Sequence, residues 1–244
     1  MVLAPKLAAA GSAVIDNSPA WRSDTNAALV VAEINRHALR SIPKGNIANP
    51  NCKTMAAMPV LKPVLKQLHD RAGLKRLAAS TCQAGSGAGV AGVAELELQI
   101  DALGKGAGVL ASRGGAMTFP APKKWAVPIA INGVALNYKP GEDGYTDEEL
   151  KPRDETRKIL EIPGLPVSGT CVCVPVCAGH SVPINAQFGR PVSAAAATGI
   201  LGQAPGVVVT GIPNALEATG RDPVYVGRIR PDRTRAARPR AVAE

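Results

Sequence analysis

The chain has 244 residues, 46% of them hydrophobic and 19% charged, which is the composition of a globular protein with a sizeable core. Its formal net charge of +9 favours anionic partners in general, but aromatic residues make up only 3% of the chain. So few stacking platforms argue against single-stranded nucleic-acid binding, and no apolar run reaches the length of a membrane span. Five cysteines in a chain of this length do not resemble a secreted disulfide framework. We therefore expect a cytoplasmic protein with neither a membrane nor a nucleic-acid partner.

The first half of the chain reads as short strands separated by turns. Apolar runs at 13–16 and 29–31 are typical of buried strands. After the turn at 49–51, apolar residues recur at helical spacing from Met55 to Leu68, so Cys52 is expected at or just before a helix N-terminus.

Strands and helices continue to intermix further on, without strict alternation. A helix over 147–160 is predicted to begin with a capping box formed by Thr146 and Glu149. The other expected elements are strands at 74–81, 126–131, 169–176, 184–188 and 207–210, a helix over 90–103 and a helix capped by Ser193. This order predicts an α/β beginning followed by an α+β body.

Cys52 is the strongest candidate for chemistry. A thiolate at a helix N-terminus is stabilised by unpaired backbone N–H groups, and Lys53 beside it is expected to lower its pKa further. A thiolate attacks carbonyl and acyl-phosphate carbons. The alternative is a buried structural cysteine, because cysteine is so often buried.

His180 follows Gly179 at the end of an expected strand, whereas His37 and His69 lie in polar segments. A histidine close to a reactive cysteine can transfer protons as a general acid and base. A structural histidine with satisfied hydrogen bonds is the alternative.

Three further patterns each have a simpler explanation. The glycine-rich run 85–89 before a helix could offer backbone donors to a phosphate, but such turns are common. Cys171, Cys173, Cys177 and His180 form a C-x-C-x3-C-x2-H run that fits no common zinc module, so no metal is expected. Glu155 and Lys158 share one helix face, where a solvated ion pair is the default interpretation.

Together these segments resemble the aspartate-semialdehyde dehydrogenase family from about residue 4 to Arg230. The resemblance rests on the order and spacing of several strings, namely 14–18 with 20–22, 48–52, 83–84 with 86–89, 143–149, 155–160, 166–171 and 179–181. It implies the NADPH-dependent reduction of L-aspartyl 4-phosphate to L-aspartate 4-semialdehyde through a cysteine thioester. It also implies a homodimer acting in lysine, threonine, methionine and diaminopimelate biosynthesis.

The resemblance assigns a role to each matching position. Cys52 would be the nucleophile and His180 the acid and base. Gln83 and Glu155 would orient the substrate, Arg22 and Lys158 would bind the phosphate, and Ser86 and Gly87 would contact the NADP cofactor.

The sequence also departs from the family pattern. Cys173 stands where the family has an arginine that grips the substrate carboxylate, and a cysteine offers no bidentate, charge-assisted bonding. The family's first βα unit, with its glycine fingerprint, has no counterpart here. Beyond Arg230 the pattern gives way to an Arg/Pro/Ala-rich stretch.

We therefore expect three parts. Residues 1–52 would be the C-terminal remnant of a Rossmann-type NADP-binding domain. Residues 53–230 would be a mixed-sheet catalytic and dimerisation domain of the glyceraldehyde-3-phosphate dehydrogenase type, and 231–244 a disordered tail. Two alternatives to an active enzyme of this family, which truncation would impair, are a non-catalytic dimerisation remnant (or translated pseudogene) and an enzyme similar to N-acetyl-glutamyl-phosphate reductase.

Overall fold

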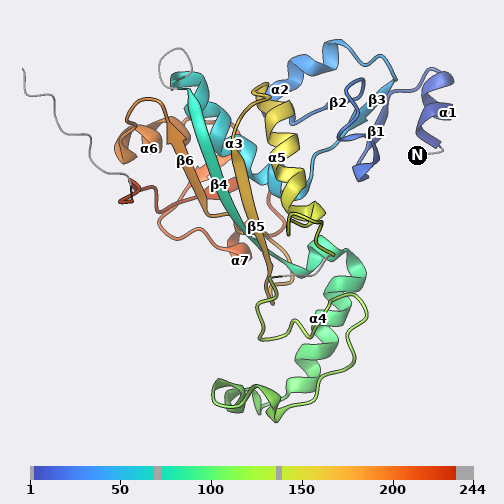
Figure 1. The fold of residues 1–244 in the computed structure, drawn as a ribbon, viewed down its shortest axis with the longest axis vertical. Helices are drawn as coiled ribbons and strands as arrows, with labels where there is room; N and C mark the ends of the chain where they lie inside the picture. Colours follow the sequence, from blue (N-terminus) through green and yellow to red (C-terminus); the bar gives the residue numbers. More distant parts are fainter. Residues whose placement is uncertain (1–2, 69–72, 136–138, 235–244) are drawn as a thin grey trace, which may run out of the picture.

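The computed structural model describes residues 3–68, 73–135 and 139–234 (Figure 1). In chain order its elements are α1 (Leu3–Ala9), β1 (Val14–Asp16), β2 (Ala28–Leu29), α2 (Ala32–Asn35), β3 (Asn46–Ala48), α3 (Cys52–Leu68), β4 (Leu74–Gln83), α4 (Val90–Leu103), α5 (Asp147–Leu160), β5 (Val167–Cys173), β6 (Ile184–Phe188), α6 (Ala194–Gly202), β7 (Val207–Val209), α7 (Ala215–Ala218) and β8 (Val224–Val226). Of the expected tail, 231–234 is described and contains no helix or strand, while 235–244 and His69 lie outside the described residues.

The described residues form three sheets. A small parallel sheet of order β1-β3-β2 comes first in the chain, a mixed sheet of order β5-β4-β6 follows, and β7 and β8 form a two-stranded parallel sheet. In the mixed sheet β4 runs parallel to β5 and antiparallel to β6. Figure 1 shows the small sheet to one side of the mixed sheet, with α3 and α5 next to the latter. The expected combination of an α/β beginning and a mixed-sheet body is confirmed.

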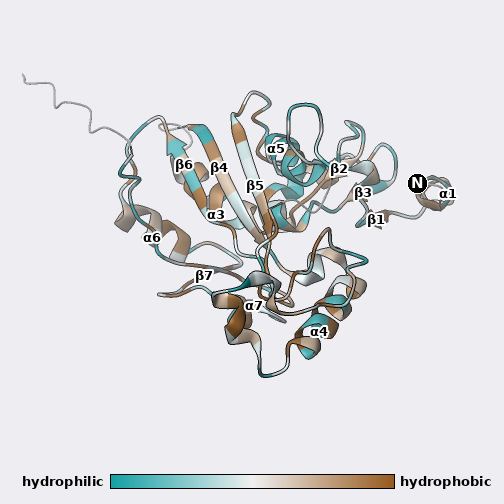
Figure 2. Ribbon diagram, turned by 60° about the horizontal axis from the view of Figure 1, so that its bottom comes forward, coloured by the Kyte–Doolittle hydropathy of each residue, from teal (hydrophilic) through white to brown (hydrophobic). Residues whose placement is uncertain are grey.

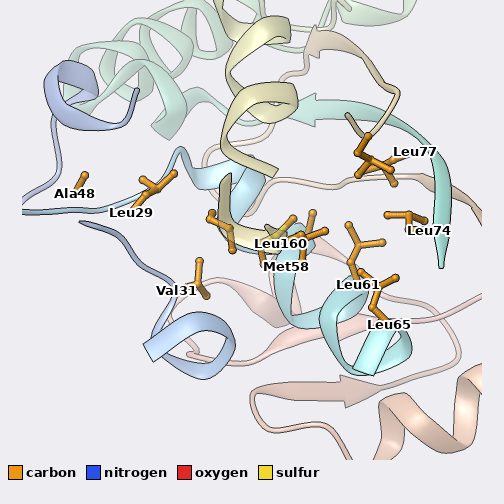
Figure 3. Close-up of a cluster of buried hydrophobic side chains, with 12 residues drawn as sticks. Leu29, Val31, Ala48, Met58, Leu61, Leu65, Leu74, Leu77 and Leu160 are labelled. Atoms are coloured by element: carbon orange, nitrogen blue, oxygen red, sulfur yellow. The ribbon is translucent and has the colours of Figure 1, made fainter. Parts of the chain in front are cut away.

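One core connects the small sheet and the mixed sheet. Leu29 and Ala48 of the small sheet, Met58 of α3 and Ile159 of α5 belong to one buried cluster, which continues to Leu77 of β4. Figure 3 shows these side chains converging between the helices and the strands. Met58 and Ile159 are 0% exposed, and burying a side chain of this size contributes roughly 1.5–3 kcal/mol. The positions of β3, α3 and α5 are thus fixed relative to one another.

A second cluster packs α4 against the segment after residue 124. Leu96 of α4 meets Trp125 and Ile129 there. The strand expected at 126–131 is wrong, because the backbone N–H groups of Ile129 and Ala130 donate to the Gln99 side chain of α4 (2.8 and 3.1 Å). Pro128 also lacks a backbone donor, so this segment is an irregular chain laid against a helix.

Most other expected elements are present with small shifts at their ends. The capping box is confirmed, since the carboxylate of Glu149 accepts the backbone N–H of Thr146 at 2.9 Å. The Ser193 hydroxyl caps α6 by accepting from the Ala196 N–H. The strand expected at 29–31 ends at Leu29, because the side chain of Asn35 captures the Val31 N–H and begins α2. Sequence patterns missed α1, α2, β3, α7 and β8, which are all short.

Candidate active site

Cys52 is the first residue of α3, as expected. The preceding residue holds it in place from two sides. The Asn51 N–H donates to Oε2 of Glu155 at 2.7 Å, and the Asn51 side chain accepts the Lys53 N–H at 3.1 Å, in the manner of an N-cap. The thiol of Cys52 is exposed at this turn.

His180 meets Cys52 across the site. Its Nε2 atom lies 3.0 Å from the Cys52 Sγ atom, so the structure brings the two candidates together. Gly179 makes this possible, with φ at +84° and a position where an added Cβ would lie 3.0 Å from Ala215. A residue with a side chain would be strained and crowded there.

A backbone contact settles which nitrogen of His180 carries the proton. The Ala84 N–H donates to Nδ1 of His180 at 3.0 Å. Nδ1 must therefore be unprotonated, and in neutral imidazole the proton then lies on Nε2. Burial lowers the pKa of His180, and the nearby Lys53 cation lowers it further, which favours this neutral form. His180 thus directs an N–H donor at the Cys52 sulfur.

The net pKa of Cys52 differs from the sequence-based expectation. Burial raises the pKa of the Cys52 thiol even though part of the residue is exposed, because the surrounding protein removes water from the sulfur. Lys53 lowers this pKa as expected, but not by enough, and Glu148 raises it. The expected net decrease is therefore wrong for the free thiol.

Glu155 and Arg22 extend the site behind Asn51. Glu155 is 4% exposed, and its Oε1 lies 3.5 Å from Nη1 of Arg22. Burial raises the pKa of Glu155, while hydrogen bonds from Thr54 and Asn51 and the charge of Arg22 act in the opposite direction. Arg22 also donates to the backbone oxygens of Asn49 and Asn17 at 2.8 and 2.9 Å.

Lys158 does not form the solvated ion pair with Glu155 that the helix spacing suggested. Its Nζ donates to the backbone oxygens of Arg22, Asp24 and Ala27 at 3.1, 2.7 and 2.9 Å. An ammonium has three hydrogens, so all of them are used by this loop. Burial lowers the pKa of Lys158. A role for Lys158 in phosphate binding stays a prediction, and it requires at least one of these carbonyls to be released.

Gln83 ends β4, one residue before the backbone N–H that fixes His180. Its side chain is buried, and its Oε1 has no hydrogen-bond partner within the described residues. The short 3-10 turn Gly85–Ala88, which contains Ser86 and Gly87, packs directly on it. An added Cβ at Gly87 would lie 2.5 Å from Nε2 of Gln83, so this glycine lets the turn approach the side chain closely.

The predicted site residues are therefore connected by one chain of contacts. It runs from Lys158 through Arg22 and Glu155 to the Asn51–Cys52 turn, and on through His180 to the turn that follows Gln83. Figure 2 shows α5, which carries Glu155 and Lys158, as a largely hydrophilic ribbon beside β5. Polar side chains such as Glu155 and Lys158, on a helix that packs against a sheet, are the sequence feature that indicates this site.

Sequence analysis missed a buried group behind Cys52. Lys53 is 2% exposed, and its Nζ contacts Glu148 Oε2 at 3.0 Å and Cys171 Sγ at 3.1 Å. The sequence predicted only that Lys53 lowers the pKa of Cys52, and nothing in the sequence spacing indicated its buried partners. Cys173 lies on the same strand face, as alternation predicts, but packs in the second cluster with Leu96.

The described residues contain no group of three or more His, Cys, Asp or Glu side chains placed to hold a metal ion. Nor does any helix in the described ranges have the length and apolar character needed to cross a membrane.

A cysteine at a helix N-terminus in contact with a histidine, beside a mixed sheet, is the arrangement of enzymes that use a cysteine nucleophile. Comparisons with known proteins agree. The family model for the dimerisation domain of semialdehyde dehydrogenase matches residues 65–242, and the model for its NAD-binding domain matches residues 1–42. The chain belongs to the aspartate-semialdehyde dehydrogenase family.

Individual relatives show the extent of the match. The chain is 56% identical to aspartate-semialdehyde dehydrogenase of Streptomyces akiyoshiensis over 95% of its own length and 68% of the relative's. It superposes with a TM-score of 0.86 and 33% identity on aspartate semialdehyde dehydrogenase II of Vibrio cholerae complexed with ASA, covering 96% of this chain and 67% of that one. The enzyme of Candida albicans with NADP aligns at a TM-score of 0.63 and 25% identity, covering 91% of this chain and 63% of that one.

Proposed function

We propose that this chain reduces L-aspartyl 4-phosphate to L-aspartate 4-semialdehyde with NADPH, through a thioester on Cys52. The observation that carries the proposal is the 3.0 Å contact between Nε2 of His180 and Sγ of Cys52. A nucleophilic sulfur with a proton donor beside it is what acyl transfer from a phosphate requires.

Cys52 and His180 have different roles in this reaction. The Cys52 thiol loses its proton to solvent, its sulfur attacks the carbonyl carbon, phosphate leaves with the electrons of the carbon–oxygen bond, and the acyl group remains on sulfur. When the aldehyde is formed, the carbon–sulfur bond breaks and the electron pair returns to Cys52. His180 faces that sulfur with Nε2–H and stabilises the negative charge by donating a hydrogen bond or a proton. A placed acid of this kind contributes roughly 10²- to 10⁴-fold in rate.

The remaining predicted residues hold the substrate in this proposal. Glu155 and Gln83 orient it, because both carboxylate and amide are buried next to the reactive turn. Arg22 and Lys158 supply positive charge for the phosphate once their backbone contacts are exchanged for it. Glu155 also positions Cys52, because its carboxylate accepts a hydrogen bond from the N–H of the preceding residue, Asn51.

The turn before α4 is suited to bind a phosphate group of a dinucleotide. Gly89 precedes the 14-residue helix α4 without a side-chain cap, so the first N–H groups of this helix are available to an anion. Ser86 and Gly87 lie in the turn that leads to it. When bound, NADPH supplies the hydride that reduces the thioester. The residues of this chain position the thioester for it.

The proposal extends to the oligomeric state, the location and the domain boundary of the chain. We infer a homodimer, a cytoplasmic location and a boundary near residue 52 between the nucleotide-binding part and the catalytic part, with 231–244 outside both. The shared core of β2, β3 and α3 supports the view that the two parts fold together.

The test is turnover in both directions by the purified full chain. Absorbance of NADPH is followed with L-aspartyl 4-phosphate, and in reverse with L-aspartate 4-semialdehyde, phosphate and NADP. Cys52→Ser is the control, and N-acetyl-L-glutamyl 5-phosphate is the comparison substrate. Activity that needs Cys52 and prefers the aspartyl substrate supports the proposal. Activity that survives Cys52→Ser contradicts it.

One observation favours a second candidate, a non-catalytic dimerisation module. The donors of Lys158 and Arg22 are engaged by backbone oxygens or by Glu155, which leaves the phosphate site closed as it stands. For this candidate, light scattering would show a dimer. Mass spectrometry would show no acyl group on Cys52 after exposure to L-aspartyl 4-phosphate.

A further inference from the structure

The buried pair behind the nucleophile has an unusual composition. The Lys53 amine and the Cys171 sulfur are 3.1 Å apart, and the Lys53 side chain is 1% exposed. Glu148 contacts the amine at 3.0 Å, and its own backbone oxygen accepts from the Cys171 sulfur at 3.4 Å. An amine, a thiol and a carboxylate are therefore enclosed at contact distance.

We propose that Lys53 and Cys171 form a redox site, in which a peroxide joins the lysine nitrogen and the cysteine sulfur through a covalent bond. Sulfenic acids condense with neighbouring thiols or nitrogens in this way. The Lys53 nitrogen is the nitrogen already in contact with the Cys171 sulfur.

The reaction balances with one equivalent of hydrogen peroxide. The Cys171 thiol attacks one peroxide oxygen, the O–O bond breaks, and the products are a sulfenic acid and water. The Lys53 ammonium passes one proton to the sulfenic oxygen, its lone pair forms the N–S bond, and the S–O bond breaks so that the oxygen leaves as water. The nitrogen loses a second proton to Glu148, which contacts it at 3.0 Å, and keeps the third hydrogen. Sulfur is oxidised by two electrons, peroxide is reduced, and an added thiol reverses the step.

The surroundings hold both atoms in this geometry. Asn51 fixes the backbone of Lys53 at the start of α3, and the Glu149 carboxylate accepts the Cys171 N–H at 3.1 Å. The nearby Cys173 is a poor competitor. Residues two apart on a strand are separated by about 6.6 Å, whereas the β-carbons of a disulfide lie roughly 3.5–4.5 Å apart. Cys171 is therefore placed for the lysine rather than for Cys173.

The bond has a consequence for the nucleophile, and this consequence rests on the proposed function. Lys53 directly follows Cys52, and its cation is a group that lowers the pKa of the Cys52 thiol. A nitrogen bound to sulfur carries no such charge, so the Lys53–Cys171 bond by itself would make the Cys52 thiol less reactive. With that charge removed the Cys52 thiol has a higher pKa, so at a fixed pH below the pKa less of it is thiolate and it reacts more slowly.

The chemical test uses the full-length Cys52→Ser variant, so that the exposed thiol does not consume the oxidant. The protein is treated with hydrogen peroxide, digested without reductant and mapped by mass spectrometry, with wild type mapped in parallel. We expect a peptide pair joined through Lys53 and Cys171, lighter than its sum by two hydrogens, which dithiothreitol separates. Lys53→Arg in the same background keeps the charge and should give oxygen adducts on Cys171 without a link.

Any other product overturns the proposal. Sulfinic or sulfonic acid at Cys171 with Lys53 intact would show that the amine does not intercept the sulfenic acid. A disulfide from Cys171 to another cysteine, or an unmodified Cys171 after oxidation of the remaining thiols, would also overturn it. None of these outcomes depends on turnover, so the redox site can fail while the proposed enzyme activity stands.

Discussion

The backbone N–H of Ala84 donates to Nδ1 of His180, and this contact leaves Nε2 as the protonated nitrogen, 3.0 Å from the Cys52 sulfur. Ala84 directly follows the last residue of β4, so the end of this strand sets the protonation of the histidine. A base that takes the thiol proton would need a free lone pair on Nε2. The resting His180 instead acts as a donor towards sulfur.

We predict that neutral His180 is almost entirely the Nε2–H tautomer. Nitrogen-15 NMR of histidine-labelled protein distinguishes the two nitrogens directly, with His180→Asn used for assignment. Because burial and Lys53 lower the pKa of His180, the neutral form should persist to lower pH than in a free histidine. An Nδ1–H signal as the main species would show that the Ala84 contact is not formed.

The same pKa shift predicts a direction for stability. A group whose pKa is lower in the folded chain binds protons more readily when unfolded, so acid favours unfolding. His180 should contribute its stability fully above pH 6.5, the ordinary pKa of a histidine, and lose it as pH falls through the lower pKa of the folded chain. His180→Asn should flatten this part of the curve of unfolding free energy against pH.

Opposite changes at Lys53 and Glu148 should shift the reactivity of Cys52 in opposite directions. Lys53 lowers the pKa of Cys52 and Glu148 raises it. Lys53→Met should therefore move the pH midpoint of Cys52 alkylation upwards, and Glu148→Gln should move it downwards. Rates with iodoacetamide across pH, with peptide mapping of the alkylated cysteine, measure both.

Two controls distinguish an electrostatic effect on the Cys52 pKa from structural damage caused by the substitutions. Lys53→Arg keeps the cation and should stay near the wild-type midpoint. Structural damage from either substitution would move the midpoint without regard to the sign of the removed charge, so shifts in one direction for both variants would contradict an electrostatic role. We also expect Cys52 to be alkylated before the buried Cys171 and Cys173.

The sequence indicated which residues belong to this site better than it indicated which residues they contact. Helical spacing and a turn placed Cys52 at the start of α3, which the structure confirms. The roles of Gln83 and Glu155 came from a family resemblance, which contained no information on hydrogen bonds. The partners of Lys53 and Lys158 lie 95 to 136 residues away in the chain, and no local pattern encodes such contacts.

The errors in the predicted secondary structure also arise from contacts or lengths that local patterns do not show. Val127 and Ile129 alternate as in a strand, but the backbone donors of that segment are taken by a glutamine of α4. Propensity could not show this, because Gln99 reads locally as one polar position on a helix. β3 was missed since a strand of three residues has too few positions to show a period.

We predict that Lys158 stabilises the fold through the loop from Arg22 to Ala27. Lys158→Met removes an ammonium from three backbone oxygens, and one hydrogen bond to a charged group is worth about 1.5–3 kcal/mol. The free energy of unfolding in urea should fall by about that amount. Lys105→Met, at an exposed position after α4, is the matched control and should change it little. An unchanged stability in Lys158→Met would mean that water replaces the ammonium without loss, and that this lysine is free to serve the phosphate.

Gly87→Ala should disturb Gln83 and leave Cys52 intact. The new methyl group would lie 2.5 Å from Nε2 and 2.9 Å from Cγ of Gln83. Gln83 is 1% exposed, and the methyl group would overlap its side chain, so the amide must rotate away from its present position. If Gln83 orients the substrate, KM for L-aspartate 4-semialdehyde should rise by roughly tenfold, the value of about 1.4 kcal/mol of lost contact. The alkylation rate of Cys52 should remain within twofold of wild type, because its contacts run through Asn51 and His180. Gly108→Ala is the control, since an added Cβ there meets nothing within 4 Å. A Gly87→Ala variant with normal KM and normal stability would show that the turn yields instead of Gln83, and that this close approach has no part in holding the substrate.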